Sequence, residues 1–167
     1  MIILGVDPGS RRTGYGAIES DGRRHRLVEK GVLDPVASQE LPLRLRYIHG
    51  RLSDLIARLR PDVMAVEDVF HARSARSALV LGQVRGVVLL AAAQSGLEVA
   101  SFAPASVKLQ VTGHGQAEKA QVAFMVAHLL SLPAQEAGDA TDALAVALCQ
   151  AHGFPLAAAA RARAERR

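Results

Sequence analysis

Short apolar runs separated by turns open the chain. The first run, 2–6, ends abruptly at the carboxylate Asp7, just before a Pro-Gly turn. An apolar run this short with such a boundary predicts a buried strand. Extended patterns resume at 13–19 and 26–33 after short turns. The start of the chain is therefore predicted to be an antiparallel meander of three strands.

Helical and extended patterns alternate in the remainder of the chain. Apolar residues at helical spacing predict a helix from Pro42 until Pro61, and the run 62–67 predicts a strand that again ends in a carboxylate, Glu67. Further helices are expected at 74–95, 104–111, 117–130 and 139–152, and a fifth strand at 98–103. This order predicts an α/β fold whose five-stranded mixed sheet has three antiparallel strands, then two parallel ones, and is flanked by helices.

Length and composition fit one soluble domain. The 167 residues suffice for a single core, and half of them are hydrophobic. No apolar run approaches the ~20 residues of a membrane span, and no signal peptide is recognisable, so a cytoplasmic protein without a membrane partner is expected. We expect a domain at 1–153 and a flexible Arg/Ala-rich tail at 154–167. The lone Cys149 is interpreted as a core thiol.

Local clusters of basic residues, more than the net charge of the chain, favour an anionic partner. The net charge is +4 and the pI about 9.8, but residues 161–167 alone supply +3. Basic residues cluster at Arg11, Arg12 and 23–26. Such patches suit nucleic acid, although solvated loops explain each cluster taken alone equally well.

Four acidic residues form the main candidate for chemistry. Asp139 and Asp142 lie three residues apart at the start of the last predicted helix, so their side chains project from the same face. Together with Asp7 and Glu67 they give four carboxylates, the ligand type of Mg²⁺ or Mn²⁺. Two such ions roughly 4 Å apart would activate water and stabilise the leaving oxygen in phosphodiester hydrolysis.

Three of these acids also have a structural interpretation. Asp139 can cap its helix, Asp142 can complete a capping box, and Asp7 can brace the following turn. Neither a turn nor a cap explains Glu67. Asp68 next to it is expected to point to the opposite face of the strand, as a supporting or solvated residue.

Five sequence motifs follow one another along the chain. They are Gly5-Val6-Asp7-Pro8-Gly9 with Thr13-Gly14, Val66-Glu67-Asp68-Val69-Phe70, Ser77-Ala78-Leu79 with Leu81-Gly82-Gln83 and Arg85-Gly86, Ala117-Glu118-Lys119 with Gln121-Val122, and Asp139-Ala140-Thr141-Asp142-Ala143-Leu144-Ala145. Each motif alone is weak, but the ordered set is specific. Through these motifs, the chain resembles the RuvC-type Holliday-junction resolvases from residue 1 to about 153.

This resemblance implies a ribonuclease H-like fold and a homodimer that acts in homologous recombination and DNA repair. The expected reaction is paired, symmetrical nicking of opposite strands of a four-way DNA junction, leaving 5′-phosphate and 3′-hydroxyl ends. Two Mg²⁺ ions per active site are expected, with Mn²⁺ as a substitute. The branch-migration proteins RuvA and RuvB are the protein partners that the resemblance implies.

The resemblance also assigns roles to single residues. It makes Asp7, Glu67, Asp139 and Asp142 the catalytic, metal-binding acids, with aspartate at 139 where some members carry histidine. Phe70 matches an aromatic that contacts bases near the junction centre, although without the resemblance a core phenylalanine is favoured. Lys108 and Lys119 match lysines that act near DNA phosphates, with a solvated helix charge as the alternative for Lys108. Arg11 and Arg12 are added as DNA-binding candidates.

Several alternatives stay open at this point. The helix at 74–95 either forms a dimer surface through Leu79, Val80, Gly82, Val87 and Leu90 or packs in the core. The motif at 7–14 also resembles the phosphate loop of actin-like ATPases and sugar kinases, which need a second loop and a second domain. A non-catalytic junction-binding module and a ribonuclease H-like nuclease for another nucleic acid, such as RNA, are the remaining candidates.

Overall fold

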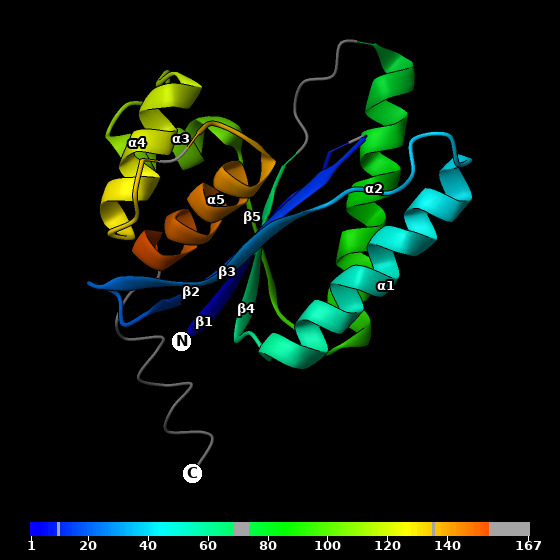
Figure 1. Ribbon diagram of the computed structural model, residues 1–167, viewed down its shortest axis with the longest axis horizontal. Helices are drawn as coiled ribbons and strands as arrows, with labels where there is room; N and C mark the ends of the chain where they lie inside the picture. Colours follow the sequence, from blue (N-terminus) through cyan, green and yellow to red (C-terminus); the bar gives the residue numbers. More distant parts are fainter. Residues whose placement is uncertain (10, 69–73, 135, 154–167) are drawn as a thin grey trace.

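A central sheet separates two layers of helices in the computed structural model (Figure 1), which describes residues 1–9, 11–68, 74–134 and 136–153. The strands are β1 (Ile2–Asp7), β2 (Thr13–Ser20), β3 (His25–Leu33), β4 (Val63–Glu67) and β5 (Val99–Phe102). Helices α1 (Leu41–Leu59) and α2 (Ala75–Gln94) cover one face, and α3 (Pro104–Thr112), α4 (Lys119–Leu129) and α5 (Asp139–Gly153) lie on the other.

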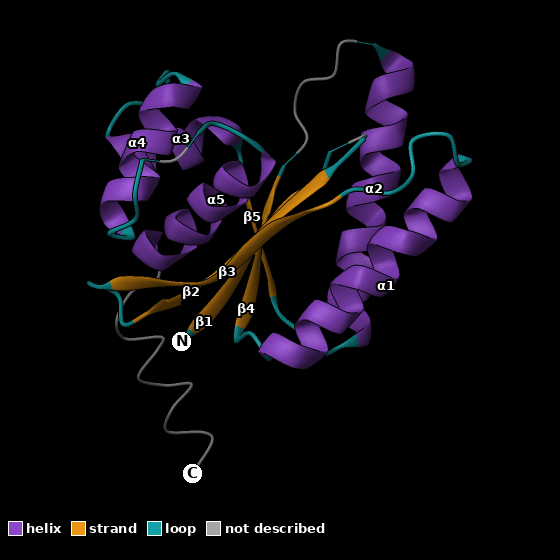
Figure 2. Ribbon diagram, viewed as in Figure 1, coloured by secondary structure: helices purple, strands orange, loops and turns teal. Residues whose placement is uncertain are grey.

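The opening strand lies in the middle of the sheet. The strand order is β3-β2-β1-β4-β5, and β2 is antiparallel to both of its neighbours, β1 and β3. β4 runs parallel to β1, and β5 runs parallel to β4. Figure 2 shows the strands between the two helical groups. The predicted five-stranded mixed sheet, with three antiparallel strands and then two parallel ones, is confirmed.

A hydrophobic core lies on each face of the sheet, and alternate residues of β1 contribute to the two cores. Leu4 and Val6 are fully buried against α1 and α2, whereas Ile3 is fully buried on the α5 side. A strand covered on both faces needs apolar residues at every position, which explains the uninterrupted run that opens the chain.

Helix α5 packs directly on the backbone of β1 and β2. A Cβ added at Gly14 would collide with the carbonyl oxygen of Asp139, and one at Gly5 would collide with the carbonyl oxygen of Ala143. Glycine is therefore required at these two positions because a helix lies where a side chain would stand. This close approach fixes the start of α5 over the end of the central strands.

Most predicted elements differ from the structure by one or two residues at an end. α4 begins at Lys119 and not at 117, because Glu118 is the N-cap and its backbone N–H donates to Gln121 Oε1 at 2.8 Å in a capping box. β3 begins one residue earlier than expected, at His25. The predicted tail at 154–167 lies outside the described residues.

Helix α2 corrects the expectation that no segment is long and apolar enough to cross a membrane. Within the described ranges it is the one helix that passes this test of length and composition. One such helix is weak evidence for a membrane span, because core helices of soluble proteins pass the same test; in α2 only 22% of the tested window is buried, with Val84, Val88, Ala91 and Ala92 packed in the core. Arg85, in the middle of α2, forms an ion pair with Asp68. Charged side chains are rare on helix faces that contact lipid.

Candidate active site

The first two acids end neighbouring parallel strands. The register pairs Val6 of β1 with Val66 of β4, so Asp7 and Glu67 follow side by side. Both lie two residues beyond positions that face α5, Gly5 and Ala65, and therefore point to the α5 side of the sheet. The sheet thus brings together two carboxylates that are far apart in the sequence.

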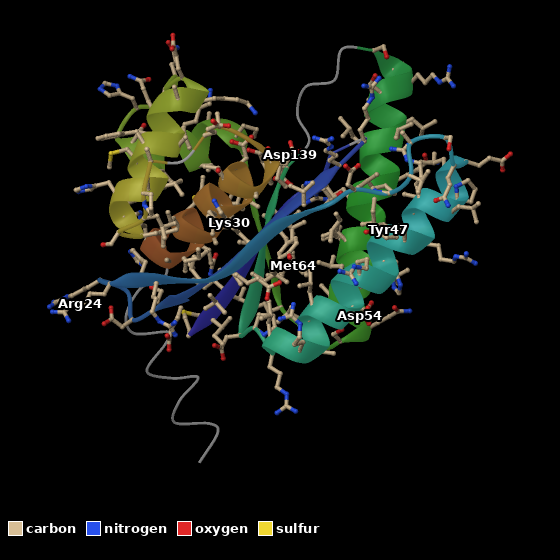
Figure 3. All side chains as sticks on the ribbon, viewed as in Figure 1. Arg24, Lys30, Tyr47, Asp54, Met64 and Asp139 are labelled. Atoms are coloured by element: carbon tan, nitrogen blue, oxygen red, sulfur yellow. The ribbon has the colours of Figure 1, made fainter. Side chains whose placement is uncertain are left out.

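The other two acids come from the first turn of α5. Asp139 begins this helix, and the backbone N–H of Asp142 donates to the carbonyl oxygen of Gly138 at 2.8 Å. Figure 3 shows Asp139 at the N-terminal end of α5, beside the central strands. Because the backbone of Asp139 contacts Gly14, which pairs with Asp7, this turn is held next to the two strand acids.

Asp7 lies at the electrostatic centre of the group. Burial, and after it the nearby charges of Glu67, Asp142 and Asp139, raise its pKa to about 8, while the charge of Lys119 opposes the rise. The pKa of Glu67 is also raised, first by burial and then by Asp142, while a hydrogen bond with Asp7 opposes the rise. Asp7 and Glu67 are therefore a closely spaced pair of acids that disfavours ionisation of both carboxyl groups at once.

Two lysines lie at the edge of the acidic group. Lys119 Nζ is 2.7 Å from Asp142 Oδ2, and this hydrogen bond raises the pKa of Lys119. Lys119 and Lys108 both lower the pKa of Glu67 by their charge. The role of Lys108 near DNA stays a prediction, with a solvated helix charge as its alternative.

The chemistry of the donor set fits a hard divalent cation. Carboxylate oxygens are the ligands that Mg²⁺ and Mn²⁺ prefer, and a cation would relieve the repulsion that now raises the pKa of Asp7. In the part of the chain that the structure describes, no three acidic, histidine or cysteine side chains surround one point closely enough to hold a metal as they stand. The Lys119 ammonium is the cation that the structure pairs with one of these acids, Asp142.

The remaining predicted residues do not join this group. Phe70 falls outside the described residues. Arg11 is exposed, and Arg12 Nε forms an exposed ion pair with Asp34 Oδ2 at 3.1 Å. Cys149 is buried, and burial raises the pKa of its thiol to about 11, which fits a core thiol.

The sequence patterns did not single out Arg85 as a site residue. It is bonded to Asp68, whose side chain lies on the α2 side of the sheet, as the strand alternation predicted. The signal that was present is a cation in the middle of an otherwise apolar helix.

The chain is similar to known proteins over most of its length. The family model for the crossover junction endodeoxyribonuclease RuvC matches residues 3–150. The RuvC of Geobacter sp. (strain M21) is 50% identical over 158 residues, which cover 95% of this chain and 96% of the relative. The RuvC of Citrifermentans bemidjiense is 51% identical over 152 residues, which cover 91% and 93%.

Solved structures agree with this match. Thermus thermophilus RuvC superposes with a TM-score of 0.83 at 35% identity, covering 91% of this chain and 94% of that one. The same protein in complex with a Holliday junction substrate gives a TM-score of 0.85 at 34% identity, covering 91% and 93%. The yeast mitochondrial Holliday junction resolvase Ydc2 shares the fold, with a TM-score of 0.66 at 14% identity.

Proposed function

Because the chain belongs to the RuvC family of crossover junction endodeoxyribonucleases, we propose that it cuts four-way DNA junctions with the carboxylates of Asp7, Glu67, Asp139 and Asp142. The protein is a Holliday-junction resolvase with a ribonuclease H-like fold. The observation that carries the assignment of the site is the convergence of three elements: Asp7 and Glu67 end neighbouring parallel strands, and the backbone of Asp139 lies against Gly14, the partner of Asp7. Acids crowded together in this way raise the pKa of Asp7, which is typical of a functional site.

The four acids would hold Mg²⁺, two ions per site, with Mn²⁺ as a substitute. When bound, these cations supply activation of the attacking water and stabilisation of the leaving oxygen in phosphodiester hydrolysis. Asp7, whose carboxyl group is influenced by the charges of Glu67 and of both acids of α5, would be the central ligand of this set. Asp139 and Asp142 approach from a helix that glycines hold tightly against the sheet, which keeps the ligand set rigid.

Lys119 and Lys108 are the cations that we assign to the substrate. The Lys119 ammonium now bonds to Asp142, at the edge of the acidic group, where a phosphate oxygen of DNA would compete for it. An ammonium suits this role because it is a compact charge with three donors. Phe70, Arg11 and Arg12 stay predictions as further DNA contacts.

We assign the dimer surface to α2. Leu79 and Leu90 are 65% and 50% exposed. Gly82 and Gly86 lie between them at helical spacing, with open space around their Cα atoms. This exposed stripe allows two helices to approach closely, and a homodimer would present two sets of acids to two opposite strands. Of the other residues predicted for the interface, Val87 packs partly against the core and Val80 is half-buried.

The cellular setting follows from the substrate. A junction-cutting enzyme works on chromosomal DNA, so we place it in the cytoplasm, in recombination and repair. RuvA and RuvB are the branch-migration partners that we propose for it. The sugar-kinase and ATPase interpretation of 7–14 is set aside, since this chain covers RuvC relatives almost from end to end.

The test is cleavage of an immobile four-way DNA junction, labelled on each strand in turn, with and without Mg²⁺. The proposal predicts symmetrical, ligatable nicks on opposite strands that depend on Mg²⁺, and no cutting of linear duplex. Binding without cutting in both Mg²⁺ and Mn²⁺ would support a non-catalytic binding module instead. Equal cutting of a four-way RNA junction would support the other nuclease interpretation.

A further inference from the structure

On the face of the sheet opposite the acids, Arg85 of α2 reaches the ends of two strands. Its Nη2 donates to Asp68 Oδ1 at 2.6 Å and to Ser101 Oγ at 2.8 Å. The side chains of Arg85 and Asp68 are only 25% and 28% exposed. Arg85 therefore ties α2 to β4 and β5 at the level where Glu67 ends its strand.

Asp68 shares its backbone with the active-site acid. Its N–H donates to the carbonyl oxygen of Phe102 at 2.8 Å, which continues the pairing of Glu67 with Phe102 by one residue. Neighbouring residues of an extended chain point to opposite faces, so Asp68 faces α2 while Glu67 faces α5. A rotation of the backbone at Asp68 would turn the Glu67 carboxylate away from Asp7.

Arg85 is a costly residue at this place in the helix. The Nε atom of Arg85 is buried, and it has no hydrogen-bond partner among the residues that the structure describes. A half-satisfied guanidinium next to Val84 and Val88, which are buried, is less favourable than a well-packed apolar side chain. We infer that Arg85 is a positioning residue, which holds Asp68 and thereby fixes the direction of Glu67; this inference rests on the proposed function.

The variant Arg85→Met removes the charge but keeps most of the side-chain volume. Its cleavage rate should fall about 10- to 100-fold, because small misplacements of catalytic groups have effects of this size. Junction affinity in EDTA should change less than about threefold, since Arg85 lies on the face away from the acids. Stabilisation of the protein by Ca²⁺, measured as the rise in melting temperature, should need a higher Ca²⁺ concentration.

A double-mutant cycle separates this role from a general loss of stability. If Arg85 acts through Asp68, the double variant Asp68→Asn/Arg85→Met should be no worse than Arg85→Met alone. The matched control is Arg58→Met, which removes the ion pair with Glu29 between α1 and β3, also 2.6 Å long. This control should cut junctions within about twofold of wild type, because exposed ion pairs contribute little.

Two results would overturn the positioning role: wild-type cleavage and Ca²⁺ response in a folded Arg85→Met variant, or additive effects in the cycle. If Arg85→Met does not fold, Arg85→Lys takes its place, since a single ammonium cannot reproduce both guanidinium bonds; wild-type behaviour there would also overturn it. A wild-type protein that fails to cut junctions would refute the proposed function, whereas the Ca²⁺ response tests the positioning of Glu67 separately.

Discussion

Asp7 keeps its proton at neutral pH in the cation-free protein, because burial and three neighbouring acids raise its pKa to about 8 from 3.8. The folded state therefore binds this proton more tightly than the unfolded state does. The stability that this protonated carboxyl group contributes is fully present below its pKa in the unfolded state, 3.8. That stability is lost as the pH rises through its pKa in the folded state, about 8. Cation-free protein should thus become less stable between these two values.

Asp7→Asn tests this dependence. In EDTA, at a pH above 8, the variant should melt about 2–4 °C higher than wild type, which corresponds to at least about 1 kcal/mol of relieved repulsion. Adding Mg²⁺ should stabilise wild type and leave the variant nearly unchanged. Asp54→Asn, at an exposed position of α1, should shift neither melting curve. Equal pH dependence in wild type and Asp7→Asn would contradict the account.

Lys119→Met removes the ammonium that bonds to Asp142. Cleavage in Mg²⁺ should fall at least about tenfold, because a charge near the reacting phosphate is lost. Junction affinity should fall by a smaller factor, and Lys119→Arg should restore affinity more than cleavage. Arg46→Met, on an exposed part of α1, is the control for loss of one positive charge. Equal losses of affinity and cleavage would make Lys119 a simple binding residue.

At the scale of elements, the contact between α5 and the sheet sets the geometry of the site. Gly14→Ala should displace α5, because the new Cβ would meet the backbone of Asp139. We expect a loss of about 1–3 kcal/mol in the free energy of unfolding, together with loss of cleavage. Chemical denaturation and junction cleavage measure the two effects.

Gly50→Ala is the matched control, since a Cβ there meets open space in α1. This change should stabilise the protein by about 0.5–1 kcal/mol, because alanine favours a helix over glycine, and leave cleavage unchanged. If Gly14→Ala behaved like Gly50→Ala, the tight packing of α5 would not control the position of Asp139 and Asp142.

The sequence was sufficient to predict the elements and the sheet, because hydrophobic period and turn residues are local signals. The apolar runs before Asp7 and Glu67 identified β1 and β4, and parallel neighbours bring their ends together. The role of Gly5 and Gly14 could not be predicted, since it depends on which helix lies over them. The hydrogen bond from Arg85 to Asp68 could not be predicted either, because it joins a helix to the end of a strand and depends on how the two elements pack.

At the scale of the whole molecule, paired nicking requires two active sites on one junction. We expect Leu79→Lys combined with Leu90→Lys to weaken self-association, since both side chains are exposed on α2 and buried charge opposes an apolar interface. Sedimentation would show more monomer, and junction cleavage would give single nicks. Leu43→Lys, on the exposed side of α1, should leave the dimer intact. A wild-type protein that is monomeric at micromolar concentration would contradict the α2 interface.

The most direct test of the central claim compares wild type and Asp7→Asn on the same immobile four-way junction, with binding measured in EDTA and cleavage in Mg²⁺. Asp7→Asn should bind the junction at least as tightly as wild type, because one negative charge near the phosphates is gone, and it should make no nicks. Nicks at the wild-type rate would contradict the assignment of the four acids as the catalytic site.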